Sequence, residues 1–72
     1  MTGPQRLDPE FVRRERLRKG MTNERLALRS SIELLRLVEI EDSLGVPPSA
    51  DEIGQIARAL GVLSPDICEE GD

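Results

Sequence analysis

The sequence contains no histidine, tryptophan or tyrosine, and it has a single cysteine, Cys68, and a single phenylalanine, Phe11. One cysteine cannot form an intrachain disulfide, and without histidine no cage of Cys and His ligands can hold a metal ion. The shortage of aromatic rings argues against folds that stack nucleobases on aromatic side chains. We therefore expect no metal and no other cofactor.

Catalysis is disfavoured for related reasons. General base chemistry without histidine requires carboxylates held in a cleft, and a chain of 72 residues leaves little room for one. Glycine-rich motifs that cradle phosphates are missing. Cys68 lies in an acidic segment, which should disfavour its reactive thiolate form. The expected activity is binding, not catalysis.

The chain also lacks an uninterrupted apolar run of the roughly 18 residues that a membrane helix needs. Its start, Met1-Thr2-Gly3-Pro4, does not resemble a signal peptide, so we expect a cytoplasmic protein. Its length allows one small domain, with a core that needs well-packed helices or self-association for stability.

Charge is distributed unevenly along the chain. The net charge is −4, but nine of the ten Lys and Arg residues precede residue 39, together with only five of the fourteen acids. A basic first half followed by an acidic second half permits an anionic partner despite the negative total. The same asymmetry also fits two sets of solvated helix faces, and the sequence leaves both interpretations open.

Capping residues and apolar spacing predict four helices and a short final turn. These elements are expected over residues 9–19, 23–30, 34–44, 50–60 and 64–67. The strongest local signal is the pair Ser49 and Glu52, which fits a capping box. The domain organisation then reads as a flexible arm (1–7), a helical domain (8–62) and a short acidic tail (63–72).

Several positions together resemble one family. They are Gly20-Met21-Thr22, Leu26-Ala27, Ile32, Leu37, Ile40-Glu41, Pro48-Ser49, Ile53 and the run from Ile56 to Val62. At this spacing the chain resembles the phage-repressor helix-turn-helix family, also called Cro-like or XRE-type, over about residues 12 to 62. The resemblance implies an all-α, lambda-repressor-like domain of four to five helices, in which Ala27 stays small where the second and third helices cross.

The resemblance also implies binding to double-stranded DNA as a transcriptional regulator. In that family the third helix enters the major groove and the start of the second helix contacts a phosphate. Carried over, the phosphate contacts are the amides of Thr22 and Asn23, with basic side chains nearby as electrostatic helpers. These helpers are Arg13, Arg14, Arg29 and Arg36. The residues that would meet the bases are Glu33, Leu34, Leu35, Val38 and Glu39.

The third helix departs from the usual chemistry of base recognition. Base edges are commonly read by Arg, Lys, Asn or Gln, whereas this helix offers two glutamates and three aliphatic side chains. Three hypotheses therefore stand: Leu34 and Leu35 contact thymine methyl groups, or Leu34, Leu35 and Val38 bind a protein partner, or the chain's own ends cover them.

Further departures from the family pattern are Asn23 for glutamine, Ser31 for the turn glycine and Glu33 for a capping Ser or Thr. A homodimer is also possible, with Leu63 and Ile67 as its expected contacts.

Overall fold

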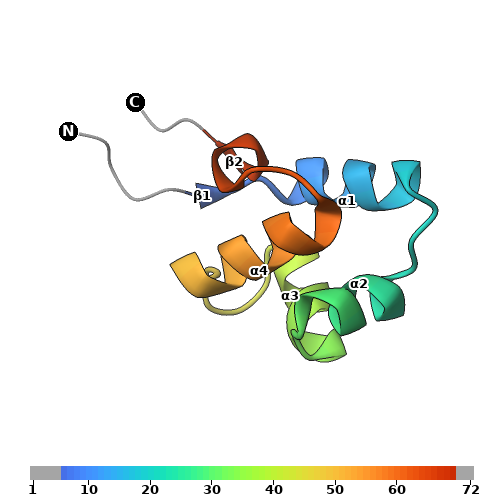
Figure 1. Cartoon of the computed structure of the whole chain (residues 1–72). Coiled ribbons are helices and arrows are strands. Elements are labelled where there is room, and N and C mark those ends of the chain that lie inside the picture. Colours follow the sequence, from blue (N-terminus) through green and yellow to red (C-terminus); the bar gives the residue numbers. More distant parts are fainter. Residues whose placement is uncertain (1–5, 70–72) are drawn as a thin grey trace.

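The computed structural model describes residues 6–69, which form four α-helices, one short 3₁₀ helix and a pair of two-residue strands (Figure 1). Along the chain these are β1 (Arg6–Leu7), α1 (Pro9–Arg18), α2 (Asn23–Ser30), α3 (Leu34–Glu41), α4 (Ala50–Leu60), η1 (Ser64–Ile67) and β2 (Cys68–Glu69). The expected all-α class is confirmed. None of the helices within residues 6–69 has the length and apolar character needed to cross a membrane.

Side-chain caps set the starts of three helices, and one of them is the capping box that the sequence predicts at Ser49 and Glu52. The Asp8 carboxylate accepts hydrogen bonds from two amides of the first turn of α1, and the Thr22 hydroxyl accepts from the Arg25 amide in α2. At α4 the capping box is complete: the Glu52 amide donates to Ser49 Oγ at 3.2 Å, and the Ser49 amide donates to Glu52 Oε1 at 2.9 Å. Local hydrogen bonding therefore explains these boundaries.

The end of α3 differs from the prediction. Helical spacing extends to Leu44, but the helix stops at Glu41 and Ser43 adopts a left-handed conformation with φ of 59°. The Leu44 amide then donates to the Glu39 carbonyl at 2.8 Å, which closes the helix end in the manner of a Schellman motif. Leu44 consequently leaves the core side of the helix and is 59% exposed.

The core draws one or more fully buried side chains from each α-helix and from η1. α2 packs against both α3 and α4, while α1 contacts α3, α4 and η1. The fully buried side chains are Val12, Leu26, Leu37, Ile56, Leu60 and Ile67. Ala27, which the resemblance places at the crossing of α2 and α3, is buried, as are Ile32, Leu37 and Ile40.

The two ends of the described chain join the core, which the predicted arm and tail do not anticipate. β1 pairs with β2 in antiparallel register, Leu7 is buried, and the Asp8 amide donates to the Ile67 carbonyl at 2.7 Å. Residues 1–5 and 70–72 of the predicted arm and tail lie outside the described residues. Because Ile67 is wholly buried, it cannot form the expected dimer contact, whereas Leu63 remains exposed.

A buried ion pair joins α1 to α3. Arg16 donates from Nε and Nη2 to the two carboxylate oxygens of Glu41 at 3.1 and 3.3 Å, and from Nη1 to the Met21 carbonyl at 2.9 Å. The side chains of Arg16 and Glu41 are only 11% and 3% exposed. Arg16 therefore fastens α1, the turn before α2 and the end of α3 at one point.

Removing one member of this pair should destabilise the domain severely. We expect Glu41→Leu alone to lower the free energy of unfolding by about 3–5 kcal/mol, because the Arg16 charge is left buried without its partner. The double variant Arg16→Met/Glu41→Leu should recover most of that loss, since no buried charge remains. Urea denaturation of wild type, both single variants and the double variant measures the effect. Additive losses in the double variant would contradict it.

Candidate nucleic-acid interface

α2 and α3 are joined by the three-residue turn 31–33. Ser31 has φ of 60° and ψ of 30°, so it occupies the left-handed conformation for which glycine is better suited. The Ile32 amide donates to the Ala27 carbonyl at 3.1 Å, and the Ile32 side chain is buried beneath the turn. The turn therefore fixes where α3 begins relative to α2.

The outer face of α3 consists of Glu33, Leu34, Leu35, Val38 and Glu39, the residues that the resemblance places against bases. Leu35 is 73% exposed and Leu34 is 38% exposed, while Val38 is half-buried and both glutamates are exposed. The described ends of the chain therefore do not cover Leu34 and Leu35. Helical spacing places Leu34, Val38 and Leu35 within an arc of about 100°. Glu39 lies next to Leu35 around the helix, and Glu33 occupies the capping position before the first turn.

The acids of this face differ in their surroundings. The Glu33 side chain makes no hydrogen bond to the start of α3, although Glu33 occupies the capping position. Glu39 Oε1 lies 3.8 Å from Arg36 Nη1, which offsets part of its charge. Glu33 is therefore the acid whose charge most directly opposes an anionic partner on this face.

The start of α2 has the polarity expected for an anion contact. Its first intrahelical hydrogen bond runs from the Leu26 amide to the Thr22 carbonyl, so the amides of Asn23 and Glu24 precede it. These two amides lie at the positive end of the helix dipole. Asn23 Oδ1 is buried and has no hydrogen-bond partner within the described part of the chain.

Two of the four expected helper arginines are engaged inside the molecule. Arg13 Nη2 donates to Asp42 Oδ1 at 3.2 Å and to the Glu41 carbonyl at 3.4 Å. Arg36 donates from Nε and Nη2 to both carboxylate oxygens of Glu52 at 2.8 Å, and from Nη1 to the Val46 carbonyl at 2.9 Å. Both guanidinium groups therefore hold helices and loops together.

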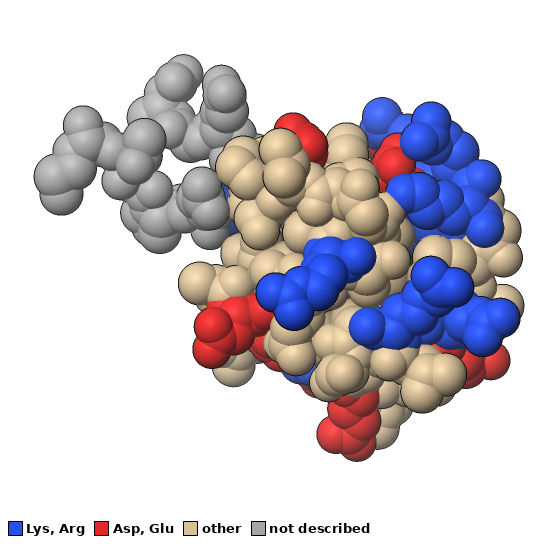
Figure 2. Space-filling view, in the orientation of Figure 1, with Lys and Arg blue, Asp and Glu red and all other residues tan. Residues whose placement is uncertain are grey.

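The other two, Arg14 and Arg29, are exposed and form no ion pair with any residue of 6–69. Figure 2 shows Lys and Arg atoms gathered over the part of the molecule where Figure 1 places the C-terminal half of α1 and α2. Positive charge therefore collects beside α2, whereas the outer face of α3 carries acids and leucines.

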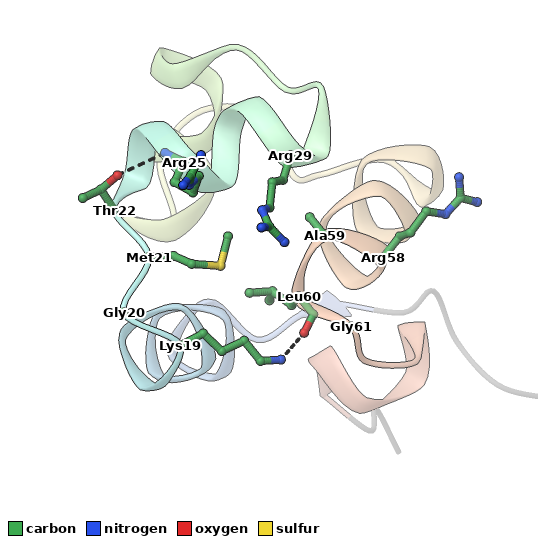
Figure 3. A pocket seen from close by; sticks show the side chains of 10 residues that line it. All are labelled: Lys19, Gly20, Met21, Thr22, Arg25, Arg29, Arg58, Ala59, Leu60 and Gly61. Carbon is green, nitrogen blue, oxygen red and sulfur yellow. Dashed lines mark hydrogen bonds between the residues drawn. The ribbon is translucent and has the colours of Figure 1, made fainter.

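Sequence reasoning missed a basic cleft between α2 and the C-terminal end of α4. The cleft has a volume of about 560 Å³ (Figure 3). Its lining residues are Lys19, Gly20, Met21, Thr22, Arg25, Arg29, Arg58, Ala59, Leu60 and Gly61. The spacing of Arg25 and Arg29 shows that they share one side of α2. No local signal, however, brings Arg58 of α4 close to them.

Clusters of three or more His, Cys, Asp and Glu side chains that could hold a metal ion are not found among the described residues. Burial raises the pKa of the Cys68 thiol, which disfavours its nucleophilic form. Comparisons with family models, curated proteins and solved structures yield no match to the chain.

The pairing of Arg36 with Glu52 should make the domain sensitive to acid. Hydrogen bonds from Arg36 lower the pKa of Glu52 from 4.5 to about 2. The stabilisation is therefore complete above pH 4.5 and decreases as the pH falls toward 2. Glu52→Gln should be less stable than wild type at neutral pH and lose less stability on acidification, as measured by urea midpoints.

The matched control is Asp51→Asn, which removes the neighbouring acid of the same helical turn. It should retain the acid sensitivity of the wild type. An acid response of Glu52→Gln as steep as that of the wild type would contradict the assignment.

Proposed function

We propose that this protein binds double-stranded DNA as a small transcriptional regulator in the cytoplasm, with α3 in the major groove. The observation that carries the proposal is the exposed outer face of α3, whose Leu34 shares a shallow depression with Glu24 in the first turn of α2. A major groove accommodates one α-helix, and helix N-termini bind phosphate oxygens through their amides. The resemblance of residues 12 to 62 to the phage-repressor family supports the same orientation.

Contacts with the phosphate backbone supply the affinity in this proposal. The amides of Asn23 and Glu24 receive a phosphate, and the unpaired Arg14 and Arg29 add long-range attraction. Arg13 and Arg36 are not assigned a phosphate contact because carboxylates and carbonyls already hold them. Attraction of this kind weakens as the salt concentration rises, because the release of counterions from DNA on binding then becomes less favourable.

Apolar contacts supply the sequence preference. Leu34 and Leu35 can pack against thymine methyl groups, whose position in the major groove distinguishes T·A pairs from G·C pairs. Neither leucine can donate a hydrogen bond to a base edge. The proposal therefore predicts a modest preference for thymine-containing sites.

A charge placed on the outer face of α3 should weaken this binding. We expect Leu35→Asp to weaken DNA binding by at least about tenfold, equivalent to roughly 1.4 kcal/mol, because a carboxylate would face the groove. Fluorescence anisotropy with labelled duplexes at several salt concentrations measures the dissociation constant.

Arg14→Ala/Arg29→Ala should weaken binding to all sequences and reduce the salt dependence, as measured by the same titrations.

Leu17→Asp is the matched control, since Leu17 is also exposed but lies on α1, and the variant has the same net charge as Leu35→Asp. Its dissociation constant should stay within about threefold of wild type. Thermal melts establish that each variant is folded. Equal losses in both variants, or binding that salt leaves unchanged, would refute recognition through α3.

Removing the opposing acid should have the reverse effect. We expect Glu33→Gln to strengthen DNA binding by about threefold, because its carboxylate would lie beside phosphates and makes no capping hydrogen bond whose loss could unfold α3. Glu10→Gln removes the same charge from α1 and serves as the control. The same anisotropy titration compares them. A gain of equal size in both variants would show that only net charge matters.

A second candidate function is a protein-binding module that uses Leu34, Leu35 and Val38. The observation that favours it is a shallow depression beside these residues, lined by Ala27, Leu28 and Leu34 among others, with Leu28 74% exposed. Burial of such leucines can drive association with a partner or a second copy. Light scattering on the DNA-binding samples distinguishes the two, since apolar association persists at high salt.

A further inference from the structure

The basic cleft between α2 and α4 contains more positive charge than the proposed recognition through α3 uses, since of its four cationic residues only Arg29 has a part in that proposal. Four of its lining residues are cationic and none is acidic, in a chain whose net charge is −4. Arg25, Arg29 and Arg58 form no ion pair with any residue of 6–69. Three unpaired guanidinium groups around one hollow create a local positive potential that an anion would relieve.

Lys19 has a different role from the arginines. Its ammonium group donates to the carbonyl of Leu60, the last residue of α4 (Figure 3). This contact neutralises the negative end of the α4 dipole, where it would otherwise repel an anion. Arg25, Arg29 and Arg58 are therefore the cationic side chains available to bind a ligand.

The side chains that line the cleft differ in direction and burial. Arg29 extends from α2 toward Ala59 and Leu60, and Arg58 stands at the rim with its guanidinium turned outward (Figure 3). Leu60 is buried, and Met21 and Ala59 are half-buried, so part of the wall is apolar. Such a wall strengthens charged hydrogen bonds to a ligand by excluding water. Arg58 can swing inward by a change of rotamer.

We infer that this cleft is a phosphate-binding site for a ligand that carries two or more linked phosphate groups. Guanidinium groups match phosphate oxygens through paired, charge-assisted hydrogen bonds, and several arginines suit a multiply charged anion. The volume of about 560 Å³ is in the range of small-ligand sites. The ligand is either a free phosphorylated small molecule or the backbone of a nucleic acid, which share this chemistry.

The site lies on a different side of α2 from α3. The depression that separates α2 from α3 is lined by Glu24, Ala27 and Leu28, whereas the basic cleft is lined by Thr22, Arg25 and Arg29. A ligand in the cleft would therefore leave the outer face of α3 open. The two sites meet only near the start of α2, which borders the cleft through Thr22.

Amide NMR titration of the whole chain with inorganic pyrophosphate tests the inference, with sodium chloride at equal ionic strength as the reference. We expect saturable shifts at residues 19–25 and 58–61. The variant Arg25→Gln/Arg29→Gln should weaken binding by at least about tenfold, because two charged donors are lost. Arg6→Gln/Arg18→Gln removes the same charge from exposed arginines that do not line the cleft and should change the affinity by less than about twofold.

Two further measurements identify the source of the phosphate and separate this site from α3. Displacement of pyrophosphate by a short DNA duplex would assign the cleft to a nucleic-acid backbone, and simultaneous binding would assign it to a free ligand. Leu35→Asp should bind pyrophosphate as wild type does, even if DNA binding fails. The absence of saturable shifts in the folded wild type, or equal weakening by the two double variants, would overturn the inference.

Discussion

The buried contact between Arg16 and Glu41 is the constraint on which the remaining structure depends. One guanidinium group satisfies a carboxylate at the end of α3 and a carbonyl in the turn before α2, so three segments share one anchoring side chain. Burial removes both charges from water, which makes any other arrangement of α1 and α3 costly once the core has closed. This contact ties both the end of α3, which carries the outer face, and the turn that leads into the α2 N-terminus to α1.

The features that the sequence predicts correctly are those encoded within a few neighbouring residues. Caps at Asp8, Thr22 and Ser49 act over two or three positions, so a short window reveals them. The inward position of Leu37 and Ile40 and the outward position of Leu35 follow from helical spacing once the helix is recognised. The end of α3 was predicted incorrectly because Leu44 continues the helical spacing of apolar residues, and no strong sequence signal marks the left-handed conformation of Ser43.

The features that the sequence did not reveal depend on partners far along the chain. Arg13 and Arg36 look like free basic residues until the fold brings Asp42 and Glu52 to them. Arg16 looks similar, although its partner lies 25 residues away and the pair is buried. The basic cleft has the same origin, because α2 supplies two of its arginines and α4 the third. Charge counts along a sequence therefore overestimate the number of cations available to a ligand on one surface and miss those that gather on another.

The pairing of β1 with β2 brings the two ends of the described chain next to each other. Arg6 and Glu69 are directly opposed in register, so the first and last described residues are neighbours across a single ladder. A brief linker could join them, and a new opening could be placed in the exposed segment 42–47, where no helix would be cut. Such a permuted chain would keep every helix in place while moving its free ends next to α3, within reach of whatever occupies that surface.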